Sequence, residues 1–172
     1  MISPVSEIIT SAPAFYQNYI RRVEGQPLLE LLESQKDRLT EFFWDIPADK
    51  LLYRYAEGKW SIKEILGHMI DTERIMSYRM LRFARNDQTA LPGFEEDDYV
   101  ANCDFDSIKD EDLLEEFMLI RESSLRMIRN FTPEVWKRGG IASGQFITVE
   151  ALACILGGHV EHHLEVVQER YL

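Results

Sequence analysis

The chain has 172 residues, of which 45% are apolar and 28% are charged, a balance typical of a folded protein rather than a disordered one. Thirty acidic residues against nineteen basic ones give a formal net charge of −11, and such a field repels nucleic acids and anionic membrane surfaces. Because the chain also lacks a run of about 18 apolar residues, we expect neither a nucleic-acid partner nor a membrane span.

The length suits one domain over residues 1–172, since a chain of this size can bury a sizeable core but rarely divides in two. The N-terminal segment lacks the basic start, apolar core and small-residue cleavage site of a secretion signal. The two cysteines, Cys103 and Cys154, show no C-x-x-C spacing and are typical of free thiols in a reducing compartment. These features predict a cytoplasmic protein.

Helical periodicity dominates the first half of the chain. After an irregular start we expect a short helix over residues 13–22, and apolar spacing then predicts a long helix over 28–46, which Pro47 ends. A second long helix begins after Ser61, because Ser61 and Glu64 form a capping-box pattern. Its apolar stripe continues to about residue 85.

A long connection follows over residues 86–106 and includes the acidic run 95–98. Its length indicates either a functional lid or a crossover along the axis of a bundle. We then expect a third long helix from about residue 107 to 131, a short helix over 134–138 ended by glycines, and a final helix over 147–170. No alternating β-branched run indicates a strand. The predicted fold class is all-α, a four-helix bundle with one long crossover connection.

Three of the four histidines fall within five residues of the last predicted helix. His159 and His163 lie one turn apart inside its apolar sector, with Leu156 and Val167, whereas His162 lies toward the flank. Burying imidazoles without partners costs on the order of 1–3 kcal/mol for each unpaired group, and a shared divalent cation would remove that cost at one nitrogen of each ring. The pair favours a metal site, with hydrogen-bonded core histidines as the alternative.

The fourth histidine, His68, falls at the edge of the apolar stripe of the second long helix, in line with Ile65 and Thr72. One ligand from this helix and two from the last would build a three-histidine site in the bundle core. Such a set leaves at least one coordination position open, as in catalytic zinc sites. Three imidazoles suit zinc, nickel, iron and copper alike. The H-E-x-x-H, paired Glu-x-x-His, G-x-S-x-G, Walker and G-x-G-x-x-G patterns are absent.

Three segments resemble the DinB-like (DinB/YfiT-like) superfamily of bacterial four-helix-bundle proteins: YRYAEGKWSIKEILGHMIDTERIMSYRMLRFAR, LPGFEEDDYV and GGHVEHHLEVVQERYL. The resemblance covers nearly all of the chain. It implies that His68, His159 and His163 hold a divalent metal, often zinc or nickel in that family. Relatives include S-transferases that use small cytosolic thiols, a thiol-dependent maleylpyruvate isomerase, and proteins assigned by inference as metal-dependent hydrolases. Many members are homodimers, so the resemblance also implies a homodimer.

Charged residues near His68 have two interpretations each. Asp71, one turn beyond His68, could orient an imidazole, or it could be a solvated helix residue or a partner of Arg74. Arg74, Arg79 and Arg82 could bind substrate carboxylates at the mouth of the site, but ion pairs with the surrounding acidic residues are favoured. His162 is either an outer neighbour of the site or a surface residue, and could replace His163 as a ligand at an i, i+3 spacing.

Two functions follow as hypotheses. The first is a metal-dependent enzyme that activates a small thiol, as an S-transferase does, or a water, as a hydrolase does. The second is a non-catalytic, stress-associated binding or scaffold protein in which the metal fixes the packing of two helices. An open coordination position beside an accessible cavity would favour the first hypothesis, and a site sealed by side chains would favour the second.

Overall fold

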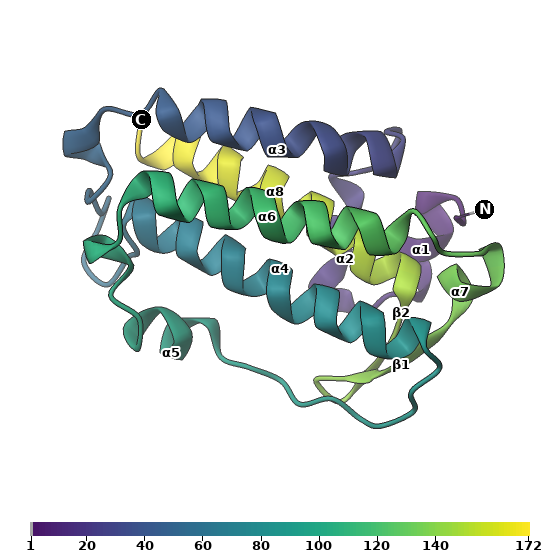
Figure 1. The fold of residues 1–172 in the computed structure, drawn as a ribbon. Coiled ribbons are helices and arrows are strands. Elements are labelled where there is room, and N and C mark those ends of the chain that lie inside the picture. Colours follow the sequence, from purple (N-terminus) through teal and green to yellow (C-terminus); the bar gives the residue numbers. More distant parts are fainter. Residues whose placement is uncertain (1) are drawn as a thin grey trace.

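The computed structural model describes residues 2–172 and contains a bundle of four long helices with the bundle axis running across Figure 1. These are α3 (Leu28–Trp44), α4 (Ile62–Ala84), α6 (Asp110–Ile128) and α8 (Val149–Arg170). Each of α3 and α4 packs against both α6 and α8, so the consecutive helices α3 and α4 lie at opposite corners of the bundle. The all-α four-helix bundle predicted from periodicity is confirmed.

The long connection after α4 runs back along the whole bundle, because α4 and α6 point in the same direction (Figure 1). The prediction of one long crossover is therefore also confirmed. The crossover is not wholly irregular, since its acidic run forms the N-cap and the first half of a short helix, α5 (Glu96–Ala101), and a 3-10 turn follows at Phe105–Ser107. Acidic side chains in the first turn of α5 face the positive end of the helix dipole, which explains why a helix begins there.

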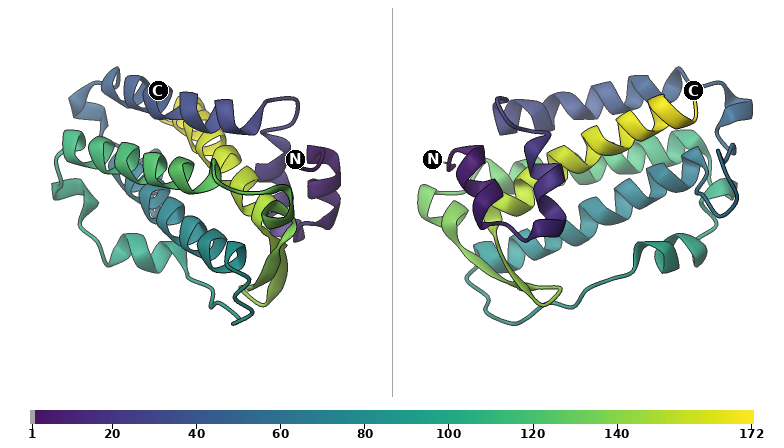
Figure 2. Two further views of the ribbon diagram at one scale, coloured as in Figure 1. Left: turned by 45° about the vertical axis from the view of Figure 1, so that its right-hand side comes forward. Right: turned by 180° about the vertical axis from the view of Figure 1, so that it is seen from behind.

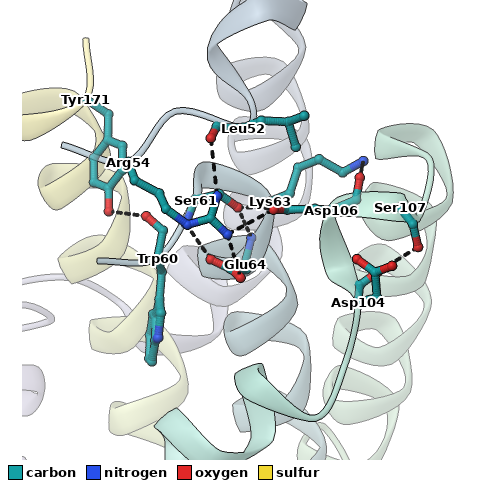
Figure 3. A network of polar contacts seen from close by, with 10 residues as sticks. All are labelled: Leu52, Arg54, Trp60, Ser61, Lys63, Glu64, Asp104, Asp106, Ser107 and Tyr171. Carbon is teal, nitrogen blue, oxygen red and sulfur yellow. Dashed lines mark hydrogen bonds and ion pairs between the residues drawn. The ribbon is translucent and has the colours of Figure 1, made fainter. Parts of the chain in front are cut away.

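The start of α4 is fixed by a network of polar contacts (Figure 3). The Ser61 hydroxyl accepts a bond from the Glu64 backbone N–H at 3.0 Å, and the Glu64 carboxylate accepts one from the Ser61 N–H at 2.6 Å. This is the predicted capping box. Beside it, the Tyr171 hydroxyl donates to the Trp60 carbonyl oxygen at 2.8 Å. The end of α8 is thus tied to the residue that precedes α4.

Two short helices at the N-terminus, α1 (Val5–Ser11) and α2 (Ala14–Arg21), lie across the first half of α8, as the right-hand view of Figure 2 shows. The chain was expected to be irregular before residue 13, so α1 corrects that expectation. The backbones of α2 and α8 approach closely, because a Cβ atom at Gly158 would lie 1.8 Å from the Tyr19 carbonyl oxygen. Only glycine fits at this point of contact.

A β-hairpin between α6 and α8 contradicts the prediction that the chain forms no strand. After the short helix α7 (Pro133–Lys137), β1 (Gly139–Ala142) pairs antiparallel with β2 (Gln145–Thr148), with Gly140 opposite Ile147. The two-residue turn at Ser143 and Gly144 has φ of 51° and 75°, the positive values that a tight hairpin turn requires. The strands were not predicted because each has only four residues and β1 begins with two glycines, so no alternation of apolar and polar residues is visible. The final helix therefore begins at residue 149 and not at 147.

A polar layer across the middle of the bundle separates two apolar clusters. One cluster holds Leu32, Met76, Leu125 and Leu156 among its members, and the other holds Leu39, Ile70, Phe117 and Val160. Between them each long helix contributes a buried polar residue: Gln35, Glu73, Arg121 and His159. Within residues 2–172, no helix has the length and apolarity needed to cross a bilayer.

Candidate metal centre

The three predicted histidines meet in the bundle core. His68 projects from α4, while His159 and His163 project from successive turns of α8. The Nε2 atom of His159 lies 2.9 Å from that of His68 and 3.1 Å from that of His163. All three side chains are buried, with exposed fractions of 8%, 6% and 8% for His68, His159 and His163. One ring nitrogen of each histidine therefore points to a common centre.

The donor set suits a transition metal. At a metal–nitrogen distance of about 2.0–2.1 Å, tetrahedral geometry separates two ligand nitrogens by roughly 3.3 Å, close to the two separations observed here. Among residues 2–172, these three histidines form the one group of metal-binding side chains whose ligand atoms all lie within 4.8 Å of one another. Three neutral nitrogens without a carboxylate favour metals of the zinc, nickel or copper type over magnesium or calcium.

Burial also lowers the pKa values of the three histidines. Desolvation lowers the pKa of His68 to about 4, with a smaller contribution from His162. Burial first, and the neighbouring histidines second, hold the pKa values of His159 and His163 well below the usual 6.5. The imidazoles are therefore neutral at pH 7, which is the form that binds metals.

Aromatic rings enclose the cluster. The Trp60 ring lies 4.7 Å from the His68 ring, centroid to centroid, and the Tyr19 ring lies 5.4 Å from that of His159. His162 is half-buried, stacks edge to face on Tyr19, and stays outside the group of converging nitrogens. The structure thus places His162 as an outer neighbour of the cluster, with its ring centroid 4.9 Å from that of His163.

Of the two interpretations of Asp71, the structure is consistent with a partly solvated helix residue. Its half-buried carboxylate has no hydrogen bond to an imidazole, and Arg74 forms its ion pair with Glu116 instead. Burial raises the pKa of the Asp71 carboxyl, while Arg74 opposes that shift. The orienting role proposed for Asp71 therefore lacks a contact that could carry it.

The arginines of α4 lie away from the histidines. Arg82 is half-buried and pairs with Asp87, as expected for a cation in an acidic chain. Arg79 is instead buried and donates to the Pro92 carbonyl at 2.8 Å and the Ser143 hydroxyl at 3.1 Å, so it holds the crossover against the hairpin. Together with the pairing of Arg74, these contacts account for all three side chains without a substrate.

Two cavities reach the histidine cluster from different sides. The first has a volume of about 390 Å³ and is lined by His68 and His159 together with Tyr19, Thr72 and Glu96. The hydroxyl oxygen of Thr72 is buried without a hydrogen-bond partner in the structure. The second cavity, of about 360 Å³, is lined by His162 and His163 together with Trp60, Lys59 and Arg170. The cluster is therefore not sealed by side chains.

A second polar cluster in the core was missed by the sequence analysis. Arg121, fully buried on α6, donates from Nε and Nη2 to the two carboxylate oxygens of Glu73, both at 2.9 Å. Its Nη1 donates to the Gln35 side-chain oxygen at 2.7 Å, and the Gln35 amide donates to the Gly157 carbonyl at 2.9 Å. All four long helices are joined by this network. The sequence feature that could have indicated this network is the position of Arg121 inside the apolar stripe of the third long predicted helix.

Both cysteines are free. Burial raises the pKa of the Cys154 thiol to about 12 and also raises that of Cys103, so neither thiol ionises readily at neutral pH. A nucleophilic cysteine of the chain itself is therefore not a component of this centre.

Known proteins share both the sequence pattern and the fold. The DinB superfamily model matches residues 31–167. A protein of Oceanobacillus iheyensis, named by inference as a metal-dependent hydrolase, is 25% identical over 139 residues that cover 79% of each chain. The solved structure of YfiT from Bacillus subtilis, described as a probable metal-dependent hydrolase with an unusual four-helix bundle topology, superposes with a TM-score of 0.76. That likeness covers 83% of this chain and 82% of YfiT at 18% identity.

Because the family model spans most of the sequence, the chain belongs to the DinB superfamily. The matched segment includes His68, His159 and His163, as well as the Arg121 network. The family resemblance carried by the three sequence segments is confirmed.

Proposed function

We propose that this protein is a metal-dependent hydrolase in which His68, His159 and His163 hold one zinc or nickel ion. The observation that carries the proposal is the convergence of three buried, neutral imidazole nitrogens at a point that two cavities reach. The names given to the relatives from O. iheyensis and B. subtilis support the hydrolytic class. Both cavities make the non-catalytic scaffold the weaker hypothesis, because a purely structural site is normally closed.

When bound, a divalent cation lowers the pKa of a coordinated water or thiol and so supplies a nucleophile near neutral pH. The chain's own residues do the remaining work. Burial keeps the three imidazoles neutral, and the Trp60 and Tyr19 rings pack beside His68 and His159. Thr72 also lines the first cavity, and its hydroxyl is buried behind that lining without a hydrogen-bond partner.

The first test is elemental analysis of untagged protein that has been purified without chelator. We expect about one transition metal per chain in the wild type, none in His163→Ala, and an unchanged content in His162→Ala. His162 is the matched control because it has the same chemistry on the same helix but lies outside the converging group. Metal retained by His163→Ala, or no uptake of zinc or nickel by the wild type, would contradict the proposal.

Stability and turnover then separate the remaining alternatives. A metal at 100 times its Kd should raise the free energy of unfolding by about 2.7 kcal/mol, and His163→Ala should lose that gain. The metal-loaded protein should cleave nitrophenyl esters or amides at a rate that chelation abolishes. Turnover only when a small thiol and an electrophile are both present would assign the S-transferase reaction instead. Bound metal without either reaction would favour the scaffold hypothesis.

The single domain over residues 1–172, the homodimer and the cytoplasmic location stay predictions.

A further inference from the structure

The two cavities at the histidine cluster differ in charge. The first cavity, beside His68 and His159, has Glu95 and Glu96 in its lining and contains neither lysine nor arginine. The second cavity, beside His163, has Lys59 and Arg170 in its lining, with Asp97 as its one carboxylate. In a chain with a net charge of −11, a basic lining beside a candidate metal centre goes against the overall charge.

Neither cation of the second cavity has a carboxylate partner among the described residues. Nine arginines and two lysines of this structure form ion pairs within 4.0 Å, but Lys59 and Arg170 do not. Arg170 is instead held by Tyr55, because its Nη1 donates to the Tyr55 hydroxyl at 3.2 Å and its guanidinium lies 5.6 Å from the centre of that ring. The remaining guanidinium N–H groups stay available to an anion.

The position of Arg170 on α8 directs it toward the centre. Arg170 follows His163 by seven residues, which is close to two helical turns, so both side chains leave the same face of the helix. The two Cα atoms are separated by about 10 Å along the axis, and long side chains on a helix point back toward its N-terminus. The guanidinium therefore lies within reach of a small molecule that also touches His163.

Lys59 is brought to the same cavity by the network at the start of α4. The Tyr171 hydroxyl holds the carbonyl of Trp60, the residue after Lys59, and Tyr171 follows Arg170 directly (Figure 3). The indole of Trp60 lies 4.7 Å from the His68 ring, centroid to centroid, and lines the second cavity together with the two cations. The second cavity thus combines two unpaired cations, aromatic walls and an edge of the histidine cluster.

We propose that Lys59 and Arg170 form a subsite that binds an oxyanion of the substrate, a carboxylate or phosphate placed a few bonds from the group held at the three histidines. This inference rests on the proposed metal site, and it assigns the substrate class: a small anionic compound whose apolar part lies against Trp60 and Tyr55. Arginine suits the role because its planar N–H groups match the geometry of both anions.

Hydroxamates test the subsite, because they bind a metal through one end and can carry a charge at the other. Isothermal titration of zinc-loaded protein would compare four probes: acetohydroxamate, succinate monohydroxamate, its terminal carboxamide, and a terminal phosphonate of the same length. We expect the carboxylate or the phosphonate to bind at least about tenfold more tightly than the carboxamide, because charge-assisted hydrogen bonds exceed neutral ones. Whichever anion gains more identifies the natural oxyanion.

Two double variants test which residues cause the preference for the charged probe. The double variant Lys59→Gln/Arg170→Gln should bind acetohydroxamate as the wild type does but lose the tenfold preference for the charged probe. The matched control, Glu95→Gln/Glu96→Gln, changes two charges in the other cavity and should keep that preference. All four side chains are exposed or half-exposed, so neither variant disturbs the core.

The outcomes are distinguishable. Equal affinity for charged and neutral probes, with acetohydroxamate bound, would overturn the subsite and leave the proposed function standing. A preference that persists in Lys59→Gln/Arg170→Gln would also overturn the subsite. If zinc-loaded protein binds no hydroxamate at all, the open metal centre itself is wrong, and the subsite is rejected with it.

Discussion

Two buried polar clusters lie in the same layer of this bundle, and they differ in whether their polar groups have partners within the chain. The network of Arg121, Glu73 and Gln35 contains its own complements, since the guanidinium faces a carboxylate and the amide bonds to both the guanidinium and the backbone. The cluster of His68, His159 and His163 contains three neutral bases that face one another without a carboxylate. Cavities reach the second cluster, while Arg121 and Gln35 are fully buried in the first.

A structural polar core and a binding site differ in whether the chain itself supplies every partner. A complete set of donors and acceptors needs no further partner, and its removal is felt as lost stability. A set of one chemical type with its ligand atoms aimed at one point is completed only by something that the chain does not supply. Burial alone therefore does not identify function, because both clusters are buried to a similar degree.

The largest effect should come from breaking the complete cluster. Arg121→Met leaves the Glu73 carboxylate buried without its counter-charge, which typically costs about 3–5 kcal/mol. Urea denaturation of metal-free protein measures the loss. The double variant Arg121→Met/Glu73→Leu should recover much of it, because no lone charge is then left in the core.

His163→Ala is the matched comparison, also in metal-free protein. It removes a neutral ring and leaves no unpaired charge, so it should cost less than Arg121→Met. Equal losses from the two variants would mean that the histidine cluster is as much a structural unit as the arginine network, and the contrast between them would fail.

A smaller effect should come from the packing that holds the histidine cluster. Gly158→Ala would place a methyl group 1.8 Å from the Tyr19 carbonyl oxygen, so α2 must move away from α8 and carry Tyr19 off His159. Overpacking of this kind costs about 1–3 kcal/mol, and zinc affinity should fall as well. Urea denaturation and zinc titration measure the two effects.

The neighbouring glycine provides the control. A Cβ at Gly157 meets only side-chain atoms, the nearest of them Val23 Cγ1 at 3.1 Å, and alanine is favoured over glycine in a helix by about 1 kcal/mol. Gly157→Ala should therefore be close to neutral for stability and for zinc affinity. If Gly157→Ala and Gly158→Ala weaken zinc binding equally, the close approach of α2 does not position His159.

The smallest effect is on the pH dependence of stability, to which the histidine cluster should contribute and the arginine network should not. The pKa of His68 is lowered by burial to about 4 in the folded chain, against about 6.5 when unfolded. Between these values the unfolded chain binds more protons, so the stability of metal-free protein is intact above about pH 6.5 and falls as the pH drops toward 4. One such group contributes a slope of at most about 1.4 kcal/mol per pH unit.

His68→Gln should reduce this slope, whereas Arg121→Met should lower the stability without removing it. Urea titrations at a series of pH values in this window give both quantities. An unchanged slope in His68→Gln would show that folding does not lower the pKa of His68.

Local sequence pattern predicted the convergence of the three histidines better than it predicted the hairpin. Helical spacing aligned His159 with His163, and the Ser61–Glu64 capping box set the start of the helix that carries His68. Helical spacing and capping boxes involve only a few neighbouring residues, so they can be recognised without knowing how the helices pack. The hairpin was not predicted, because its two short strands are stabilised by non-local contacts. The strands pair with each other, and the Leu91 N–H donates to the Ile141 carbonyl at 2.9 Å.

The four long helices, the crossover and the three histidines that converge could be predicted from the sequence, because apolar periodicity, caps and turn-to-turn spacing are local properties. Which charged side chains pair with one another depends on the tertiary structure. It paired Arg121 with Glu73 across 48 positions and left Lys59 and Arg170 unpaired beside the histidines, 111 positions apart in the chain. Such pairings depend on which corners of the bundle the helices occupy, and hydrophobic burial sets that arrangement over the whole chain.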